Sequence, residues 1–206
     1  YTPGPATEKE WAETYPLEKE ALDYFIHNAG SPNGVIDGGI PVFAAGNEYA
    51  GNPAFPGAYS KCVCVASVAA DYTPACYTDY GTLVTLSAPG GDLEYYGKIG
   101  EEEDEYWAET AEQKGAVLST LIQNGKPAYG YMEGTSMACP HVSGVAALGL
   151  AYAVKQHRHY RAADFVSLMK KAVKDLDGYY GNGATKIYYM NHTTVGASPE
   201  IVNLSK

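Results

Sequence analysis

Apolar residues recur along the chain at two spacings, which predict alternating helices and strands. Residues 17–29 carry apolar side chains at helical spacing, and Gly30 follows them as a helix-stop signal. Three short apolar runs closed by turn residues predict buried strands: 40–45, 62–68 and 82–88. Two longer apolar segments predict a pair of packed helices: 136–153 and 162–173. Strands that alternate with helices favour an α/β domain with a mostly parallel sheet.

The predicted order of elements starts in the middle of that pattern, because no strand precedes the helix at 17–29. We therefore expect the chain to begin inside a domain whose first strands are missing from it. A sheet without its first strands would present an open edge, so the isolated chain is expected to associate with itself or with another chain. Near the other end, residues 179–190 place Gly181-Asn182-Gly183 between tyrosine-rich stretches and predict a hairpin.

Residues 91–125 interrupt the apolar pattern with an unbroken acidic run at 101–105. A block of like charge cannot be buried unpaired, so this segment is predicted to be an exposed acidic insertion, helical over 101–114. Calcium sites need oxygen ligands spaced along a loop rather than in a block. The acidic run therefore favours a solvated surface over a calcium site.

Length, composition and charge narrow the class of protein. A chain of 206 residues with 46% hydrophobic residues can build the core of one globular domain. The formal net charge of -10 would repel a phosphate backbone, which argues against nucleic acid as a partner. No run approaches the roughly 18 consecutive apolar residues of a membrane helix, and the first residues lack a signal-peptide pattern. We therefore expect no membrane span.

The cysteines predict no metal site, and they do not indicate whether the protein resides in an oxidising or a reducing compartment. None of Cys62, Cys64, Cys76 and Cys139 lies in a C-x-x-C pair, so no metal site is predicted. Cys62 and Cys64 fall in one predicted strand, where side chains two residues apart point to the same face. Buried free thiols are favoured there over a disulfide.

A serine stands at the start of the predicted helix at 136–153, directly after a glycine turn. There the hydroxyl of Ser136 is exposed, and its backbone N–H points out of the helix end toward any developing oxyanion. Serine is also a preferred N-cap residue. By position alone, Ser136 is therefore either a nucleophile or a helix cap.

An asparagine occupies a comparable place after the predicted strand at 40–45. The apolar strand delivers Asn47 into a loop directly after Gly46. Its side-chain amide can donate a hydrogen bond to an oxyanion. A lone Gly-Asn pair is also a common turn, which is the alternative for this position.

The string at 134–144, G-T-S-M-A-C-P-H-V-S-G, closely resembles the serine motif G-T-S-M-A-x-P-H-V-x-G of the subtilisin-like serine proteases, the subtilase family. The A-A-G-N string that ends at Asn47 resembles the oxyanion motif of the same family. The resemblance implies a three-layer α/β fold, with residues 1–206 as the C-terminal portion of one catalytic domain. It also implies that Ser136 is the nucleophile and that Asn47 and the Ser136 N–H donate to the oxyanion.

The resemblance also implies properties of the substrate and the surroundings. By family position, four small residues would line the pocket for the side chain that precedes the scissile bond: Ala44, Ala45, Gly46 and Ala54. Small residues there would leave room for a large apolar side chain. The implied substrate is a polypeptide, and the implied location is extracytoplasmic. No cofactor is required, and calcium is implied as a structural ion.

The remaining members of the family's catalytic triad are not found in the sequence. Neither a D-[ST]-G turn for the aspartate nor an H-G-T helix start for the histidine occurs. The resemblance places both upstream of Tyr1, so this chain alone should not turn over peptide. His141 lies five residues along the helix from Ser136 and cannot swing back onto it, so a structural role is expected.

Two hypotheses follow for the function. The first is a serine endopeptidase whose upstream region supplies the aspartate and the histidine. The alternative is a non-catalytic subtilase-like domain used for binding or structure. A hydrolase with a G-x-S-x-G elbow is excluded, because Ala138 stands where that motif requires glycine.

Overall fold

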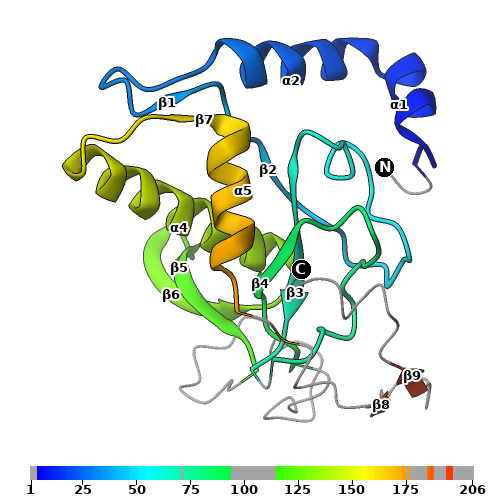
Figure 1. Cartoon of the computed structure of the whole chain (residues 1–206). Helices are drawn as coiled ribbons and strands as arrows, with labels where there is room; N and C mark the ends of the chain where they lie inside the picture. The colour runs from blue at the N-terminus through cyan, green and yellow to red at the C-terminus, as the bar shows by residue number, and fades with distance from the viewer. Residues whose placement is uncertain are drawn as a thin grey trace.

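The computed structural model describes residues 4–70, 72–93, 115–174 and 176, together with the backbone of 185–187 and 194–196. Figure 1 shows α1 and α2 across the top of the molecule and α4 running below them. The helices and strands, in chain order, are α1 Glu8–Thr14, α2 Pro16–Asn28, β1 Ile36–Asp37, β2 Val42–Ala44, β3 Val63–Val68, β4 Leu86–Pro89, β5 Val117–Gln123, β6 Lys126–Met132, α4 Thr135–Lys155, β7 Tyr160–Arg161, α5 Ala162–Ala172, β8 Thr185–Ile187 and β9 Thr194–Gly196.

Strands β2, β3 and β4 form a parallel sheet in that order. Val42 of β2 pairs with Val63 of β3, and Val65 of β3 pairs with Leu86 of β4. Every residue of β3 is buried, as expected for the middle strand of a parallel sheet that is covered on both faces. The predicted α/β class with a parallel sheet is confirmed.

Side chains of the sheet pack in two directions. Val63 and Val65 contact Ala138 and Val142 of α4 in one buried cluster. Phe43 of β2 packs instead into a cluster with Trp11 of α1 and with side chains of α2. Because successive residues of a strand point to opposite faces, the sheet lies between these two groups of helices. The arrangement has the three layers expected from the sequence.

Helix α1 was not predicted, because the proline-rich start of the chain conceals it. Thr7 caps the helix by accepting a hydrogen bond from the Glu10 N–H. The helix buries Trp11 completely, stacked on Phe55 with ring centroids 5.3 Å apart. A single buried tryptophan in a seven-residue helix gives no periodic pattern, so only the packing identifies this element.

The predicted helices at 17–29, 136–153 and 162–173 correspond to α2, α4 and α5, and the predicted strands at 40–45 and 62–68 to β2 and β3. Only the last part of 82–88 is a strand, because the Val84 N–H bonds back to the carbonyl of Gly81 in a turn. The boundary error arises because β-branched residues also occupy the turn before β4.

The hairpin of β5 and β6 was also missed. Its turn is Asn124-Gly125, and both residues have positive φ, at 51° and 75°. Asn-Gly is the preferred dipeptide for such two-residue turns, so the signal was present in the sequence. It was overlooked because residues 117–123 fell within the expected insertion at 91–125. The acidic run at 101–105 and the helix at 101–114 lie outside the described residues, so the insertion stays a prediction.

The tail contains a hairpin, but its position differs from the prediction. β8 and β9 pair antiparallel, with Lys186 opposite Val195. β9 lies beyond the predicted range of 179–190. The turn predicted at Gly181-Asn182-Gly183 lies outside the described residues, so it stays a prediction.

All four cysteines are free, and Cys62 and Cys64 are buried. Burial raises the pKa of both thiols to about 12. Both therefore stay protonated and behave as small apolar side chains. The preference for buried free thiols over a disulfide is confirmed.

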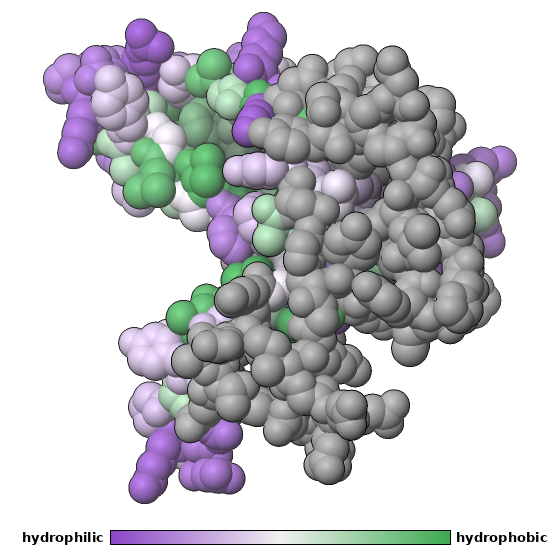
Figure 2. Space-filling view, turned by 90° about the horizontal axis from the view of Figure 1, so that it is seen from below, coloured by the Kyte–Doolittle hydropathy of each residue, from purple (hydrophilic) through white to green (hydrophobic). Residues whose placement is uncertain are grey.

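Helix α4 has the length and apolar composition of a helix that could cross a membrane, although no span was expected from the sequence. One side of it packs on β2, β3 and β4. The other side exposes Val145, Leu148 and Tyr152. Figure 2 shows hydrophobic side chains (green) gathered on a hollowed face of the molecule. Because the core helix of a globular domain meets the same criteria, length and composition alone do not define a span.

Asp23 of α2 is held by three donors. Lys19 Nζ donates to Asp23 at 2.6 Å, the Tyr59 hydroxyl at 2.5 Å and Lys61 Nζ at 2.9 Å. The hydrogen bond from Lys19, followed by that from Tyr59, lowers the pKa of Asp23 well below its ordinary value. The ionised carboxylate therefore stabilises the folded chain by fastening α2 to the segment before β3.

Asp23→Asn is expected to lower the free energy of unfolding by up to about 1 kcal/mol near neutral pH. Since the folded-state pKa is lowered, the stabilisation is fully present above the unfolded pKa of about 3.9 and is lost as the pH falls toward the folded value. Urea unfolding of the wild type and the Asp23→Asn variant at about pH 6 and about pH 2.5 measures this loss of free energy of unfolding. Glu20→Gln on the same helix is the control. A difference in free energy of unfolding between the wild type and Asp23→Asn that grows toward low pH would contradict the role of Asp23.

Candidate active site

One cavity of about 470 Å³ gathers all the site residues that the sequence singled out. It opens between the start of α4 and the loop that follows β2. Ligands of open parallel sheets bind in this region, beyond the carboxyl ends of the strands. The residues lining the cavity include Ser136, Asn47, Ala44, Ala45, Gly46 and Ala54.

Ser136 is exposed as the second residue of α4. Gly134 precedes the helix at a φ of 142°, which side chains rarely adopt, and its N–H donates to the Gly90 carbonyl at 3.0 Å. The helix therefore starts abruptly, fixed to the segment after β4. Since no helical carbonyl lies one turn before Ser136, its N–H remains available at the helix end.

The orientation of the Asn47 side chain is fixed by Thr135. Asn47 Oδ1 accepts hydrogen bonds from the Thr135 N–H at 2.9 Å and from the Thr135 hydroxyl at 2.8 Å. Thr135 is 1% exposed, so its end of both bonds is shielded from water. With the oxygen held in this way, the NH2 group forms the other end of the amide, on the side of Gly134.

Thr135 also holds the loop itself, because its Oγ1 accepts the Gly46 N–H at 3.3 Å. The sequence analysis did not assign Thr135 a role. The position of Thr135, between Gly134 and Ser136 in the serine motif, was the available signal that it takes part in the site. Its partners Asn47 and Gly46 lie 88 and 89 residues before it in the chain, so no local pattern indicates these contacts.

Two carboxyl groups lie beside the loop at Gly46. Asp79 is buried and accepts the Glu48 and Ala50 N–H groups. Burial, supported by the neighbouring Glu48, raises the pKa of Asp79 to about 6 against the lowering effect of the two backbone bonds. A side chain at Gly46, whose φ is 123°, would collide with the Asp79 carboxyl group, so glycine is required there.

Other parts of the chain complete the cavity walls. Residues 4–6 form part of one wall, and Phe55 with Gly57 forms part of another. Glu48 and Asp79 also line the cavity, so its wall is not made of small apolar residues alone. The sequence analysis missed these contributors, because they come together only when the chain folds.

None of the described histidines is placed to act on Ser136. The Nδ1 atom of His141 lies 2.8 Å from the Met137 carbonyl oxygen, within hydrogen-bond distance on the same helix. His27 lies in the last turn of α2. His157 and His159 follow α4, whose 21 residues span about 30 Å. Within residues 4–70, 72–93 and 115–174, no cluster of three His, Cys, Asp or Glu side chains could hold a metal ion.

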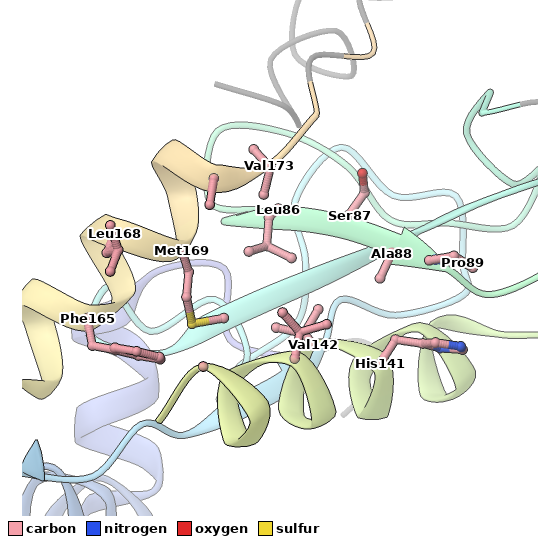
Figure 3. A pocket seen from close by; sticks show the side chains of 13 residues that line it. Leu86, Ser87, Ala88, Pro89, His141, Val142, Phe165, Leu168, Met169 and Val173 are labelled. Atoms are coloured by element: carbon pink, nitrogen blue, oxygen red, sulfur yellow. The ribbon is translucent and has the colours of Figure 1, made fainter. Parts of the chain in front are cut away.

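Two further cavities border α4. One of about 450 Å³ reaches Ser136 and lies between α4 and Leu118 of β5. The other, of about 460 Å³, does not reach Ser136. Figure 3 shows this second cavity between Leu86 of β4, Val142 of α4 and Met169 of α5. The walls of this cavity are mainly apolar side chains from α4, α5 and β4, so the cavity lies where α5 packs against the sheet.

Fold and site together define an α/β protein with a serine and an asparagine around one cavity at the carboxyl ends of parallel strands. A sequence model of the subtilase family matches residues 5–183. The chain therefore belongs to the subtilase family, a family of serine proteases.

Several relatives illustrate this membership. The chain is 36% identical to halolysin of Haloferax mediterranei over 112 residues, 54% of this chain and 17% of halolysin. It is 30% identical to thermitase of Thermoactinomyces vulgaris over 151 residues, 73% of this chain and 43% of thermitase. The solved structure of a protease from Pseudoalteromonas arctica matches with a TM-score of 0.51 at 31% identity, over 66% of this chain and 36% of that one. The chain thus spans less than half the length of each of these proteins.

Proposed function

We propose that Ser136 is the nucleophile of a serine endopeptidase and that Asn47 is its oxyanion donor. The orientation of Asn47 carries the proposal. Because Thr135 binds Asn47 Oδ1, the NH2 end of the amide is left to donate to a tetrahedral intermediate. The Ser136 N–H, at the positive end of α4, is the proposed second donor. Two donors would then meet the negative charge as it forms.

The general base is proposed to come from a region upstream of Tyr1, together with the aspartate that orients it. Two observations support this: no described histidine is placed against Ser136, and the chain spans less than half of the relatives compared above. A serine hydroxyl without a base is not activated. The 206-residue chain is therefore expected to be inactive by itself.

The cavity between α4 and β5 is the proposed seat for part of that upstream region. It reaches Ser136, and it is lined by apolar side chains that include Leu118, Val145 and Leu148. These three side chains are exposed in the chain, at 55%, 62% and 73%. Covering them would remove apolar surface from water. Without that cover, the chain is expected to associate with itself, and α4 is proposed to be a core helix rather than a membrane span.

The proposed substrate is a polypeptide, bound across the 470 Å³ cavity. Ala44, Ala45, Gly46 and Ala54 would surround the side chain that precedes the scissile bond. Their small size would accommodate a large apolar side chain at this position.

An extracytoplasmic location and a structural calcium ion are also proposed. They rest on relatives named extracellular serine proteases and on one named a calcium-dependent protease. No cofactor is proposed for the reaction itself.

A fluorophosphonate probe tests the function directly, because it reacts with activated serines. The longest natural form of the protein is expected to be labelled at Ser136, as located by mass spectrometry, and the 206-residue chain is not. Ser143→Ala, an exposed serine on the same helix, is the matched control and should leave labelling unchanged. A folded long form that resists the probe would refute the protease and favour the alternative, a non-catalytic subtilase-like domain.

A further inference from the structure

The loop that carries Asn47 is fastened at two points. Thr135 holds its first part, as described above. Residues 77–80 hold the second part by backbone bonds: the Tyr49 N–H donates to the Tyr77 carbonyl at 2.9 Å, and the Tyr80 N–H donates to the Ala50 carbonyl at 2.9 Å. Tyr49 has a φ of 52°, which is unfavourable for a side chain of its size. The second attachment therefore maintains a backbone shape that the loop would not adopt alone.

Asp79 is the centre of this second attachment. Its N–H donates to the Gly46 carbonyl at 3.0 Å. Its Oδ1 accepts the Glu48 N–H at 3.0 Å and the Ala50 N–H at 2.8 Å. One buried residue thus binds the loop immediately before and after Asn47. Asp79 is 2% exposed, so water has little access to its end of these bonds.

The other side of the Asp79 carboxyl group faces Glu48. The carboxyl oxygens Oδ2 of Asp79 and Oε2 of Glu48 converge beside Gly46, and Glu48 helps to raise the pKa of Asp79. Glu48 Oε2 in turn accepts the Asn47 N–H at 2.8 Å. Two carboxylates this close repel each other when both are ionised, whereas one proton between them makes a hydrogen bond. The protonation of Asp79 is therefore coupled to the backbone of Asn47.

We propose that Asp79 is a positioning residue that holds Asn47 in place by sharing a proton with Glu48. In the protonated form, Asp79 donates to Glu48 and still accepts the two loop N–H groups. On ionisation the proton goes to solvent, and the exposed Glu48 carboxylate turns away from Asp79 and releases the Asn47 N–H. The catalytic meaning of this step rests on the proposed oxyanion role of Asn47, but the step itself does not.

Within the described residues, the titratable groups around Asp79 leave Glu48 as its partner. Cys64 of β3 is a buried thiol whose pKa is raised to about 12, so it stays neutral. The Tyr49 and Tyr80 rings pack at a tilt of 48° with their centroids 5.2 Å apart, and burial raises the pKa of Tyr49 above its ordinary value. Burial and Glu48 together raise the pKa of Asp79 to about 6. The ionisation of Asp79 is therefore expected at mildly acidic pH.

Nuclear magnetic resonance of the 206-residue chain tests the proposal without any need for catalysis. The backbone amides of Glu48 and Ala50 and the side-chain amide of Asn47 are expected to shift together, with a midpoint of about pH 6. Asp79→Asn retains the acceptor oxygen and donates permanently to Glu48, so the shared transition should disappear while the loop keeps its shape. Glu48→Gln should move the midpoint to lower pH, because the like charge is gone.

Asp79→Ala gives an independent readout, because it removes the acceptor altogether. Hydrogen exchange at the Glu48 and Ala50 amides should then accelerate by about tenfold or more. The side-chain amide of Asn124, in the turn between β5 and β6, is the internal control and should not titrate. The proposal is overturned if the transition persists in Asp79→Asn, or if the Asn47 side chain does not move with the two backbone amides. Neither result would affect the protease assignment, which the fluorophosphonate probe tests separately.

Discussion

Ser136→Ala is expected to lower kcat/KM by about 10⁴-fold or more in the longest natural form of the protein. Without the hydroxyl oxygen, no covalent acyl-enzyme can form on the chain. The residual rate would come from substrate binding and the oxyanion donors alone. Hydrolysis of a peptide with a chromogenic leaving group measures the effect. If the Ser136→Ala variant retained more than about a hundredth of the wild-type kcat/KM, Ser136 would not be the nucleophile.

Ser143→Ala is the matched control for this experiment. Ser143 is exposed on α4, two turns from Ser136, and its hydroxyl donates only to the Cys139 carbonyl of the same helix at 3.3 Å. Its removal should leave turnover unchanged, because it does not line the 470 Å³ cavity. Equal losses in both variants would point to damage to the helix rather than to lost chemistry.

Asn47→Ala is expected to lower kcat by about 10²- to 10³-fold and to change KM little, because the amide donates chiefly to the transition state. The substitution also leaves the Thr135 N–H and hydroxyl without their acceptor. Asn47→Asp separates the two effects. It keeps an oxygen for Thr135 but replaces the donor with a negative carboxylate, so the loss in kcat should be at least as large. Steady-state kinetics of both variants in the longest natural form provides the measurement.

Thr135→Val tests how much the orientation of Asn47 contributes. It removes the hydroxyl that bridges Asn47 and Gly46 but retains the backbone bond to Asn47 Oδ1. We expect a kcat between those of the wild type and Asn47→Ala, whereas Thr135→Ser should restore the wild-type value. Asn28→Ala, at the exposed end of α2, is the matched control for loss of an asparagine. A Thr135→Val variant with unchanged kcat would show that the helix start alone orients the amide.

Local sequence determined the elements that carry the site. The apolar run before Asn47 predicted β2, and the string at 134–144 predicted the start of α4 with Ser136 exposed. Both predictions were possible because strand and helix signals extend over a few neighbouring residues. The predictions failed at α1, where one buried tryptophan gives no periodic pattern, and at the hairpin of β5 and β6, whose Asn-Gly turn signal fell within the expected insertion.

Tertiary structure decided what surrounds these elements. Thr135 orients Asn47 across 88 residues, and Asp79 reaches Glu48 across 31. The family motifs and most of the helices and strands depend on neighbouring residues, so they could be recognised from the sequence alone. The hydrogen bonds from Thr135 to Asn47 Oδ1 and from the loop to Asp79 are known only from the fold, because bonds between distant residues leave no periodic trace in the sequence.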